Sequence, residues 1–261
     1  MDVISQPLLN LIAVFYHVFG NLGIAIIAFT LFVRLILTPL VLPSMKMMQK
    51  MKELGPELEK IKKRHEGDKQ KLMQAQADFY KEKGVNPVSG CLPQIINIVI
   101  LIALFSGFNK VFQEGNITAN LNSVLHPALK ISEEVDPYFL GRDLTKPDTF
   151  AVQGLHLPFE LPGLFLITVA ALQFLSSKMM MPNVAAAEKV AKKTEGETDD
   201  MAASMQKQMI YMFPLMTIIF GLKFPLGVVV FWGAQSLFQA IQQYFISGWG
   251  GLASLVNKLR R

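Results

Sequence analysis

The sequence predicts an all-α polytopic membrane protein with five transmembrane helices, an N-terminus outside, a C-terminus inside and a cytoplasmic antiparallel helical hairpin. Three observations predict this fold class. The 261 residues are 51% hydrophobic and 17% charged, whereas charged residues make up about 25% of ordinary soluble domains. The apolar residues come in blocks of twenty or so, about the length that crosses roughly 30 Å of hydrocarbon. Lys and Arg gather in the segments between alternate blocks.

The apolar blocks predict transmembrane helices at 20–42, 91–112, 161–181, 208–221 and 227–247. The last two are separated because Gly221, Pro225 and Gly227 surround Lys223 in a short turn. The remaining segments are an extracytoplasmic interfacial segment (1–19), the cytoplasmic hairpin (43–90), an extracytoplasmic loop (113–160), a cytoplasmic loop (182–207), an extracytoplasmic turn (222–226) and a basic cytoplasmic tail (248–261).

Residues 1–19 contain no Lys or Arg, so they lack the positive region that begins a signal peptide. Their larger apolar residues fall on one face at helical spacing, which indicates a helix lying in the membrane interface. An extension of the first transmembrane helix fits the same pattern equally well.

The positive charges predict the orientation of the helices. Residues 44–90 hold eleven Lys and Arg, whereas residues 113–160 hold three, with seven carboxylates. With five crossings, the basic residues of 182–207 and of the C-terminal tail fall on the same side as the first cluster. The cytoplasmic side carries the positive excess, so the hairpin and the C-terminus are expected inside.

The hairpin is predicted from heptad spacing. Its apolar residues recur at alternating intervals of four and three: Met47, Met51, Leu54, Leu58, Ile61 and then Leu72, Ala75, Phe79. Gly55-Pro56 should kink or restart the first helix, and Gly67-Asp68 should turn the chain. The basic face of this hairpin could contact ribosomal RNA or anionic lipid, or it could be a solvated face that enforces topology.

Arg34 is the most informative residue of the apolar blocks. It lies eight residues before Leu42, hence about 12 Å into the hydrocarbon at 1.5 Å rise per residue. An arginine at that depth costs at least ~2.5–3.5 kcal/mol, and none of the predicted spans contains Asp or Glu. We therefore expect Arg34 to face a water-containing cavity; the alternative is that its long side chain snorkels to the interface.

Polar residues at helical spacing in four of the spans accompany Arg34. They predict a hydrophilic groove that opens to the cytoplasm and closes toward the outside. The candidate substrate-binding residues are Arg34, Thr30, Thr38, Gln94, Asn97, Gln173, Ser177, Trp232, Gln235 and Ser236.

Motifs of nucleotide-binding and hydrolytic enzymes are missing from the sequence. The four histidines are scattered, with no HExxH or CxxC motif beside them. We expect no enzyme activity, no cofactor and no metal.

Several motifs occur in order along the chain: Thr30-x-x-x-Arg34-Leu-Ile-Leu-Thr-Pro39, Gly55-Pro56-Glu57, Asn86-Pro87, Gly90-Cys91-Leu92-Pro93, Phe224-Pro225-x-Gly227 with Phe231-Trp232, and Gln242-Gln243-x-x-Ile246. In this combination the sequence resembles the YidC/Oxa1/Alb3 family of membrane protein insertases, of the bacterial type without the large periplasmic domain. Three residues depart from the usual pattern of that family: Asn97, Val99 and Leu226.

The resemblance implies a five-helix core with a cytoplasm-open groove in a multi-pass protein of the bacterial inner (plasma) membrane. Arg34 and Thr30 match groove positions of the family, as do Gln173 and Trp232. The implied partners are nascent membrane proteins and membrane lipids, together with the Sec translocon and the ribosome. No nucleic-acid function is expected beyond contact with the ribosome.

The working hypothesis is that the groove receives the hydrophilic tail of a nascent membrane protein while its apolar span slides along the third and fifth helices. An anion transporter or channel that uses the intramembrane Arg34 is the alternative from another class. A passive scaffold for the assembly of other membrane proteins is the third hypothesis.

Overall fold

The computed structural model of the chain describes residues 2–65, 67–86, 92–112, 116–150, 160–180 and 211–253. The chain divides into two compact units. The first comprises Met1–Ile36, Ile96–Phe174 and Phe213–Gln239, and the second Leu37–Ile95, Leu175–Met212 and Ala240–Arg261. The predicted cytoplasmic loop 182–207 and the last residues of the basic tail, 254–261, lie outside the described residues.

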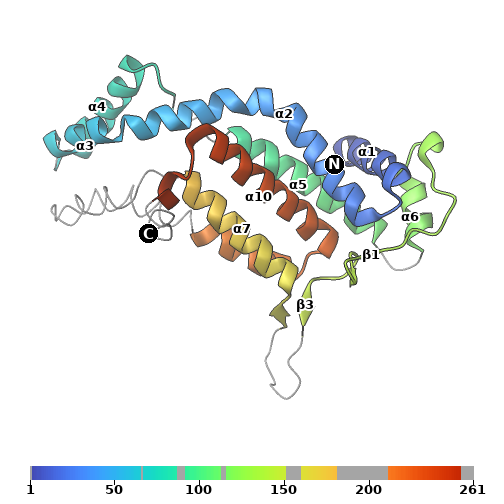
Figure 1. The fold of residues 1–261 in the computed structure, drawn as a ribbon. Helices are drawn as coiled ribbons and strands as arrows, with labels where there is room; N and C mark the ends of the chain where they lie inside the picture. Colours follow the sequence, from blue (N-terminus) through green and yellow to red (C-terminus); the bar gives the residue numbers. More distant parts are fainter. Residues whose placement is uncertain are drawn as a thin grey trace. The chain divides into compact units, whose positions relative to one another are not determined.

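Helices make up most of the described structure (Figure 1). The helices are α1 (Asp2–Phe19), α2 (Leu22–Glu53), α3 (Gly55–Arg64), α4 (Lys69–Glu82), α5 (Leu92–Val111), α6 (Ile117–Val124), η2 (Pro127–Leu129), α7 (Leu164–Met180), α10 (Leu226–Ser247) and η3 (Gly250–Leu252). Residues Tyr211–Gly221 form a further apolar helix. The strands are β1 (Tyr138–Phe139), β2 (Arg142–Asp143), β3 (Thr149–Phe150) and β4 (Leu161–Pro162).

Apolar side chains from α1, α2, α5, α6, α7 and α10 form the core of the first unit. The fully buried members include Ile12, Ile26, Phe29, Leu104, Phe108, Leu144, Leu166, Leu226, Val228 and Val229. Leu144 comes from the predicted extracytoplasmic loop, and so do the buried Leu121, Leu125, Ile131 and Val135. The described residues of this loop, 116–150 and Glu160, therefore have no separate core, because their buried apolar side chains join the core of the helices.

Helix α1 packs onto the end of α6 and the segment that follows it. Three of its polar side chains bond to backbone atoms there: Gln6 donates to the carbonyl of Val124, Asn10 accepts from the N–H of His126, and His17 bonds to the carbonyl of Leu129. Leu9 and Ile12 of α1 are buried, whereas Val3 and Val18 are exposed. The helix thus has one face toward the rest of the first unit and an apolar face away from it.

The 113–160 segment contains two short antiparallel strand pairs, β1–β2 and β3–β4. In the second pair, Thr149 lies opposite Pro162 and Phe150 opposite Leu161. Leu161 and Pro162 were predicted to begin the third transmembrane helix, but they pair as a strand and α7 begins at Leu164.

A short turn joins the Tyr211–Gly221 helix to α10, as the glycine and proline pattern predicts. The close approach of Gly221 to α7 requires the absence of a side chain, because a Cβ there would lie 2.2 Å from Cδ1 of Leu166. Leu226, one of the family departures, is buried in the core at the start of α10.

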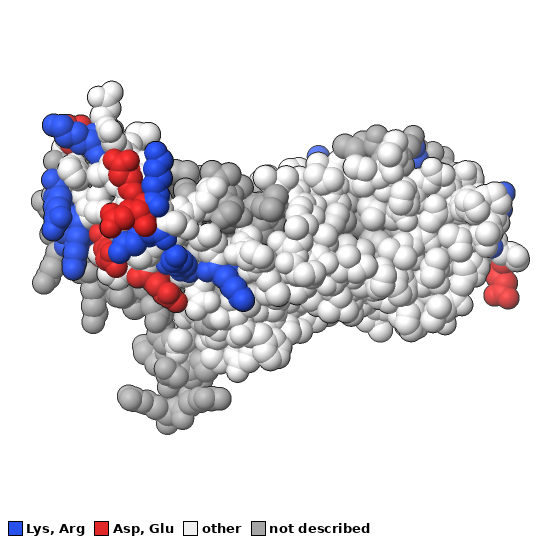
Figure 2. All heavy atoms as spheres, turned by 90° about the horizontal axis from the view of Figure 1, so that it is seen from above, with Lys and Arg blue, Asp and Glu red and all other residues white. Residues whose placement is uncertain are grey.

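In the second unit, α3 and α4 form a helical hairpin. A new helix begins at Gly55, and Asp68 caps α4 by accepting a hydrogen bond from the N–H of Lys71. That bond lowers the pKa of the Asp68 carboxyl. Lys83, which directly follows α4, contacts α3 and α2. Its ammonium lies 2.7 Å from Glu57 of α3, and its carbonyl accepts a hydrogen bond from the ammonium of Lys50 on α2. Figure 2 shows acidic side chains interspersed among the basic ones over this hairpin.

Among the described residues, the segment Leu22–Met51 of α2 is long and apolar enough to cross a membrane by length and composition. The shorter apolar helices are Val3–Phe19, Ile95–Val111, Leu164–Met179 and Tyr211–Gly221.

Candidate functional site

Arg34 and Thr30 lie on the inward face of α2. Arg34 is 7% exposed and Thr30 is 1% exposed, whereas Leu31, Leu35 and Ile36 are exposed. The Thr30 hydroxyl donates to the carbonyl of Ile26 at 2.6 Å, within its own helix. The four-residue spacing of the two polar residues therefore places both side chains inside the first unit.

Helix α10 contributes three candidate residues to the same unit. Gln235 and Ser236 are buried, and Trp232 is half-buried at the edge of the apolar core. The Ser236 hydroxyl donates to the carbonyl of Trp232 at 2.9 Å. Such a bond satisfies a hydroxyl within its own helix, so burial of Ser236 does not by itself require a ligand.

Gln173 of α7 is half-buried and contacts the Tyr211–Gly221 helix. The hydroxyl of Thr217, which is 0% exposed, donates a hydrogen bond to the side-chain oxygen of Gln173. Thr217 is missing from the predicted candidate set. The sequence marks Thr217 as the polar residue in the middle of an otherwise apolar span. The structure gives its hydroxyl a partner in Gln173.

The remaining candidates lie on α5 and in the second unit. Asn97 of α5 is half-buried in the first unit, while the side chain of Gln94 lies outside the described part of the chain. Thr38 and Ser177 are half-buried in the second unit. There the amide of Gln242 donates to the Thr38 hydroxyl at 3.4 Å, and Ser44, Ser176 and Gln243 are buried.

The structure thus brings seven of the candidates into the first unit: Thr30, Arg34, Asn97, Gln173, Trp232, Gln235 and Ser236. Their chemistry is that of polar binding. A guanidinium offers a planar fork of donors to carboxylates, and amides bond to peptide groups. In the part of the chain that the structure describes, no three His, Cys, Asp or Glu side chains could together hold a metal ion.

The chain matches a protein family along almost its whole length. Residues 14–250 match the model of the family described as 60Kd inner membrane protein. A relative from Fusobacterium nucleatum named membrane protein insertase YidC is 36% identical over 227 residues, which cover 87% of this chain and 86% of the relative.

The chain belongs to the YidC/Oxa1 insertase family. The resemblance that the motifs indicated is therefore confirmed, and the family description places its members in the inner membrane.

Other members of the family are longer than this chain. A YidC insertase from Rickettsia felis is 28% identical over 252 residues, which cover 94% of this chain and 39% of the relative. A crystal structure of an active YidC insertase with its first transmembrane domain resolved aligns with a TM-score of 0.55 at 23% identity, covering 94% of this chain and 46% of that one. The fold of this chain is therefore similar to that of a YidC insertase.

Proposed function

We propose that this protein inserts nascent membrane proteins into the bacterial inner membrane through a hydrophilic groove that contains Arg34. The observation that carries the proposal is the burial of Arg34 within the apolar helix α2. A buried arginine in a membrane helix is costly and marks a functional pathway by default. Relatives named membrane protein insertase YidC support the same role.

The proposal includes five transmembrane helices, with the N-terminus outside and the C-terminus inside. Its support is the excess of basic residues in 44–90 over 113–160. In this orientation α2, α5, α7, the Tyr211–Gly221 helix and α10 are the membrane-spanning elements. The hairpin of α3 and α4 then projects into the cytoplasm.

In the proposed groove, Arg34 attracts the carboxylates of the tail of a nascent protein. Thr30, Asn97 and Gln173 would bond to polar groups of the tail, together with Gln235 and Ser236 of α10, while Trp232 would contact its apolar side chains. Thr38, Gln94 and Ser177 belong to the second unit, and their role in substrate binding stays a prediction.

A hydrophilic groove lowers the barrier to translocation. Each unsatisfied polar group costs several kcal/mol in hydrocarbon, so a groove that reaches partway across the membrane shortens the dry path. Partition of the apolar span of the substrate into lipid, at about 0.8 kcal/mol per buried CH₂, then supplies the driving force. The insertase itself needs no ATP for this step.

The proposed partners are nascent membrane proteins, received either directly or beside the Sec translocon. The hairpin carries basic and acidic side chains together (Figure 2), so charge alone would bind RNA or anionic lipid weakly. We propose ribosome and lipid contacts for the hairpin as well, but the insertase function does not depend on them.

Site-specific photo-crosslinking tests the function. The full chain is reconstituted into liposomes as the sole protein, with a photo-crosslinking amino acid at Trp232 or, as a matched control on the same helix, at the exposed Leu237. A short substrate with an acidic tail should crosslink through its tail at Trp232 well above Leu237, and its tail should become protected from external protease. Equal crosslinking at both positions, or anion flux without any inserted protein, would overturn the proposal.

A further inference from the structure

The segment Leu144–Asp148 meets the first residues of two helices. The N–H of Leu226 donates to the carbonyl of Lys146 at 2.8 Å, and the N–H of Gly227 donates to the carbonyl of Leu144 at 2.9 Å. These are the first two N–H groups of α10, which have no acceptor inside their own helix. The segment therefore caps α10 with backbone carbonyls.

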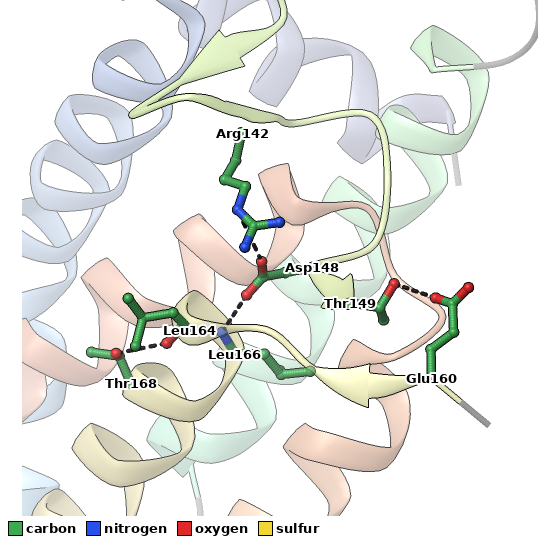
Figure 3. A network of polar contacts seen from close by, with 7 residues as sticks. All are labelled: Arg142, Asp148, Thr149, Glu160, Leu164, Leu166 and Thr168. Atoms are coloured by element: carbon green, nitrogen blue, oxygen red, sulfur yellow. Dashed lines mark hydrogen bonds and ion pairs between the residues drawn. The ribbon is translucent and has the colours of Figure 1, made fainter. Parts of the chain in front are cut away.

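Asp148 caps the other helix, α7. Its carboxylate accepts a hydrogen bond from the N–H of Leu166 at 2.9 Å, and the side chain is buried at 2% exposure (Figure 3). A residue directly before a helix usually supplies this bond from its own side chain. That residue is Gly163 here, which has no side chain, so a carboxylate from elsewhere in the chain takes its place.

Gly163 and Asp148 fit closely. The N–H of Gly163 donates to the Asp148 carbonyl at 2.7 Å, and a Cβ on Gly163 would lie 2.2 Å from Oδ1 of the carboxylate. Both the backbone and the side chain of Asp148 thus hold the start of α7. The negative charge also lies at the positive end of the helix dipole.

The segment itself is rigidly held. Leu144 is fully buried, and its N–H donates to the carbonyl of Pro137. The Asp143 carboxylate accepts from the N–H of Thr145 at 2.9 Å and from its hydroxyl at 2.6 Å. Partial burial raises the pKa of Asp143. The hydrogen bonds to Thr145 and the contact with Lys146 together lower it by more, so the net shift of the pKa is downward.

The two capped helices pack on each other beyond the segment. They lie side by side (Figure 1), and a Cβ at Gly233 of α10 would lie 2.8 Å from Cγ2 of Val169 on α7. Gln173 follows one turn after Val169, and Trp232 precedes Gly233. A shift of α7 along its axis at Leu164 would therefore displace Gln173 relative to Trp232, because a helix moves as a stiff rod.

We propose that Leu144–Asp148 is an extracytoplasmic clamp that fixes the register of α7 against α10, and that Asp148 is a positioning residue for Gln173 and Trp232. The expected effect of the clamp on insertion rests on the proposed function, whereas its effect on the register of the two helices does not. Arg142 is peripheral to the clamp, since its Nε is 4.0 Å from Oδ1 of Asp148 and its side chain is half-exposed.

The register is measured by disulfide formation. In a Cys91→Ser background, which removes the native cysteine, Val169→Cys and Gly233→Cys place two thiols at the α7–α10 contact. Asp148→Ala should lower both the rate of disulfide formation and the rate of substrate insertion by roughly fivefold or more. Asp148→Asn keeps an acceptor for the N–H of Leu166 and should restore most of both.

Two matched controls separate the clamp from its surroundings. Arg142→Gln removes the ion-pair partner, and Thr149→Val removes the hydrogen bond to Glu160 in the neighbouring strand pair. Both variants should leave the rates of disulfide formation and of insertion at the values found with native Arg142 and Thr149, since neither removes the bond from Leu166 to Asp148.

If Asp148→Ala leaves the rate of disulfide formation in the Val169→Cys/Gly233→Cys protein unchanged, the clamp is overturned, whatever happens to insertion. If the Val169→Cys/Gly233→Cys protein with native Asp148 forms the disulfide while the wild-type protein inserts nothing, the proposed function is contradicted instead. If Asp148→Ala does not accumulate in the membrane, Asp148→Glu decides: its longer side chain should slow disulfide formation relative to Asp148→Asn, and equal rates in these two variants would overturn the clamp.

Discussion

The hydroxyl of Thr217 donates a hydrogen bond to the side-chain oxygen of Gln173, so two helices distant in sequence share a polar contact inside the first unit. The same hydroxyl lies 3.0 Å from the carbonyl of Phe213. Thr217 is fully buried while Gln173 is half-buried. Thr217 therefore orients an amide that is itself partly accessible.

Thr217→Val keeps the shape of the side chain and removes the donor. We expect a loss of about 1 kcal/mol in the free energy of unfolding, the usual net value of one such bond. The cost should be smaller in a Gln173→Leu background, where the acceptor is already absent. Thermal unfolding of the four detergent-purified proteins of this double-mutant cycle measures the difference. Equal costs of Thr217→Val in both backgrounds would contradict the coupling.

Arg34 should act through its charge. At about 4 Å and an effective dielectric constant of 20, two unit charges attract by roughly 4 kcal/mol. Insertion of substrates with acidic tails should therefore be retained in Arg34→Lys, fall in Arg34→Ala and fall further in Arg34→Glu. Protease protection of the tail in proteoliposomes measures this, with a neutral-tailed substrate as the control. If all three variants insert acidic tails equally well, Arg34 does not attract them.

The helix boundaries that depend on local chemistry were predicted from the sequence. The new helix α3 begins at Gly55 because Pro56 interrupts the hydrogen bonding of the preceding helix, and α10 begins directly after Pro225. Of the candidate site, the sequence also predicted a shared face for Thr30 and Arg34, since helical spacing fixes that face.

The contacts that depend on distant parts of the chain were not predicted. Asp148 is one of seven carboxylates in 113–160, and no sequence pattern distinguishes it from those that face solvent. Its role follows from its position opposite the N–H of Leu166 and against Gly163, which the packing of α7 determines. Leu161 was assigned to a transmembrane helix from apolarity alone, whereas its pairing with Phe150 makes it a strand residue.

Lys83 should hold the hairpin together. Its ammonium lies 2.7 Å from Glu57 and 5.4 Å from the centre of the Phe79 ring. Glu57→Gln should broaden the distance distribution between spin labels at Lys60→Cys and Met73→Cys, on α3 and α4, in a Cys91→Ser background. Glu59→Gln, which changes another acid of α3, is the matched control and should leave the distribution unchanged.

The pH dependence of this contact has a definite sign. The hydrogen bond to Glu57 raises the pKa of Lys83. Its contribution is therefore fully present below the unfolded pKa of about 10.4 and is lost as the pH rises through the higher folded pKa. The distance distribution of the spin-labelled protein with native Glu57 should broaden over that range, and that of its Glu57→Gln variant should show no such step. An identical alkaline transition in both proteins would contradict the assignment to Lys83.

The contact between Gly233 and Val169 predicts a steric requirement for glycine on α10. A Cβ at Gly233 would lie 2.8 Å from Cγ2 of Val169, which is closer than real Cβ contacts allow. Overpacking of this kind costs about 1–3 kcal/mol, while the higher helix propensity of alanine returns up to about 1 kcal/mol. Gly233→Ala should therefore lower the thermal unfolding temperature of the purified protein.

Removal of the opposing methyl groups should relieve the overlap. Val169→Ala alone leaves a void and destabilises, but the double variant Gly233→Ala/Val169→Ala should lose less than the sum of the two single losses, because the new methyl fills part of that void. Gly55→Ala is the control: a Cβ there meets nothing within 4 Å, so the substitution in α3 should be neutral or stabilising. If Gly233→Ala proves as harmless as Gly55→Ala, α7 and α10 are not held at the close separation on which their shared register depends.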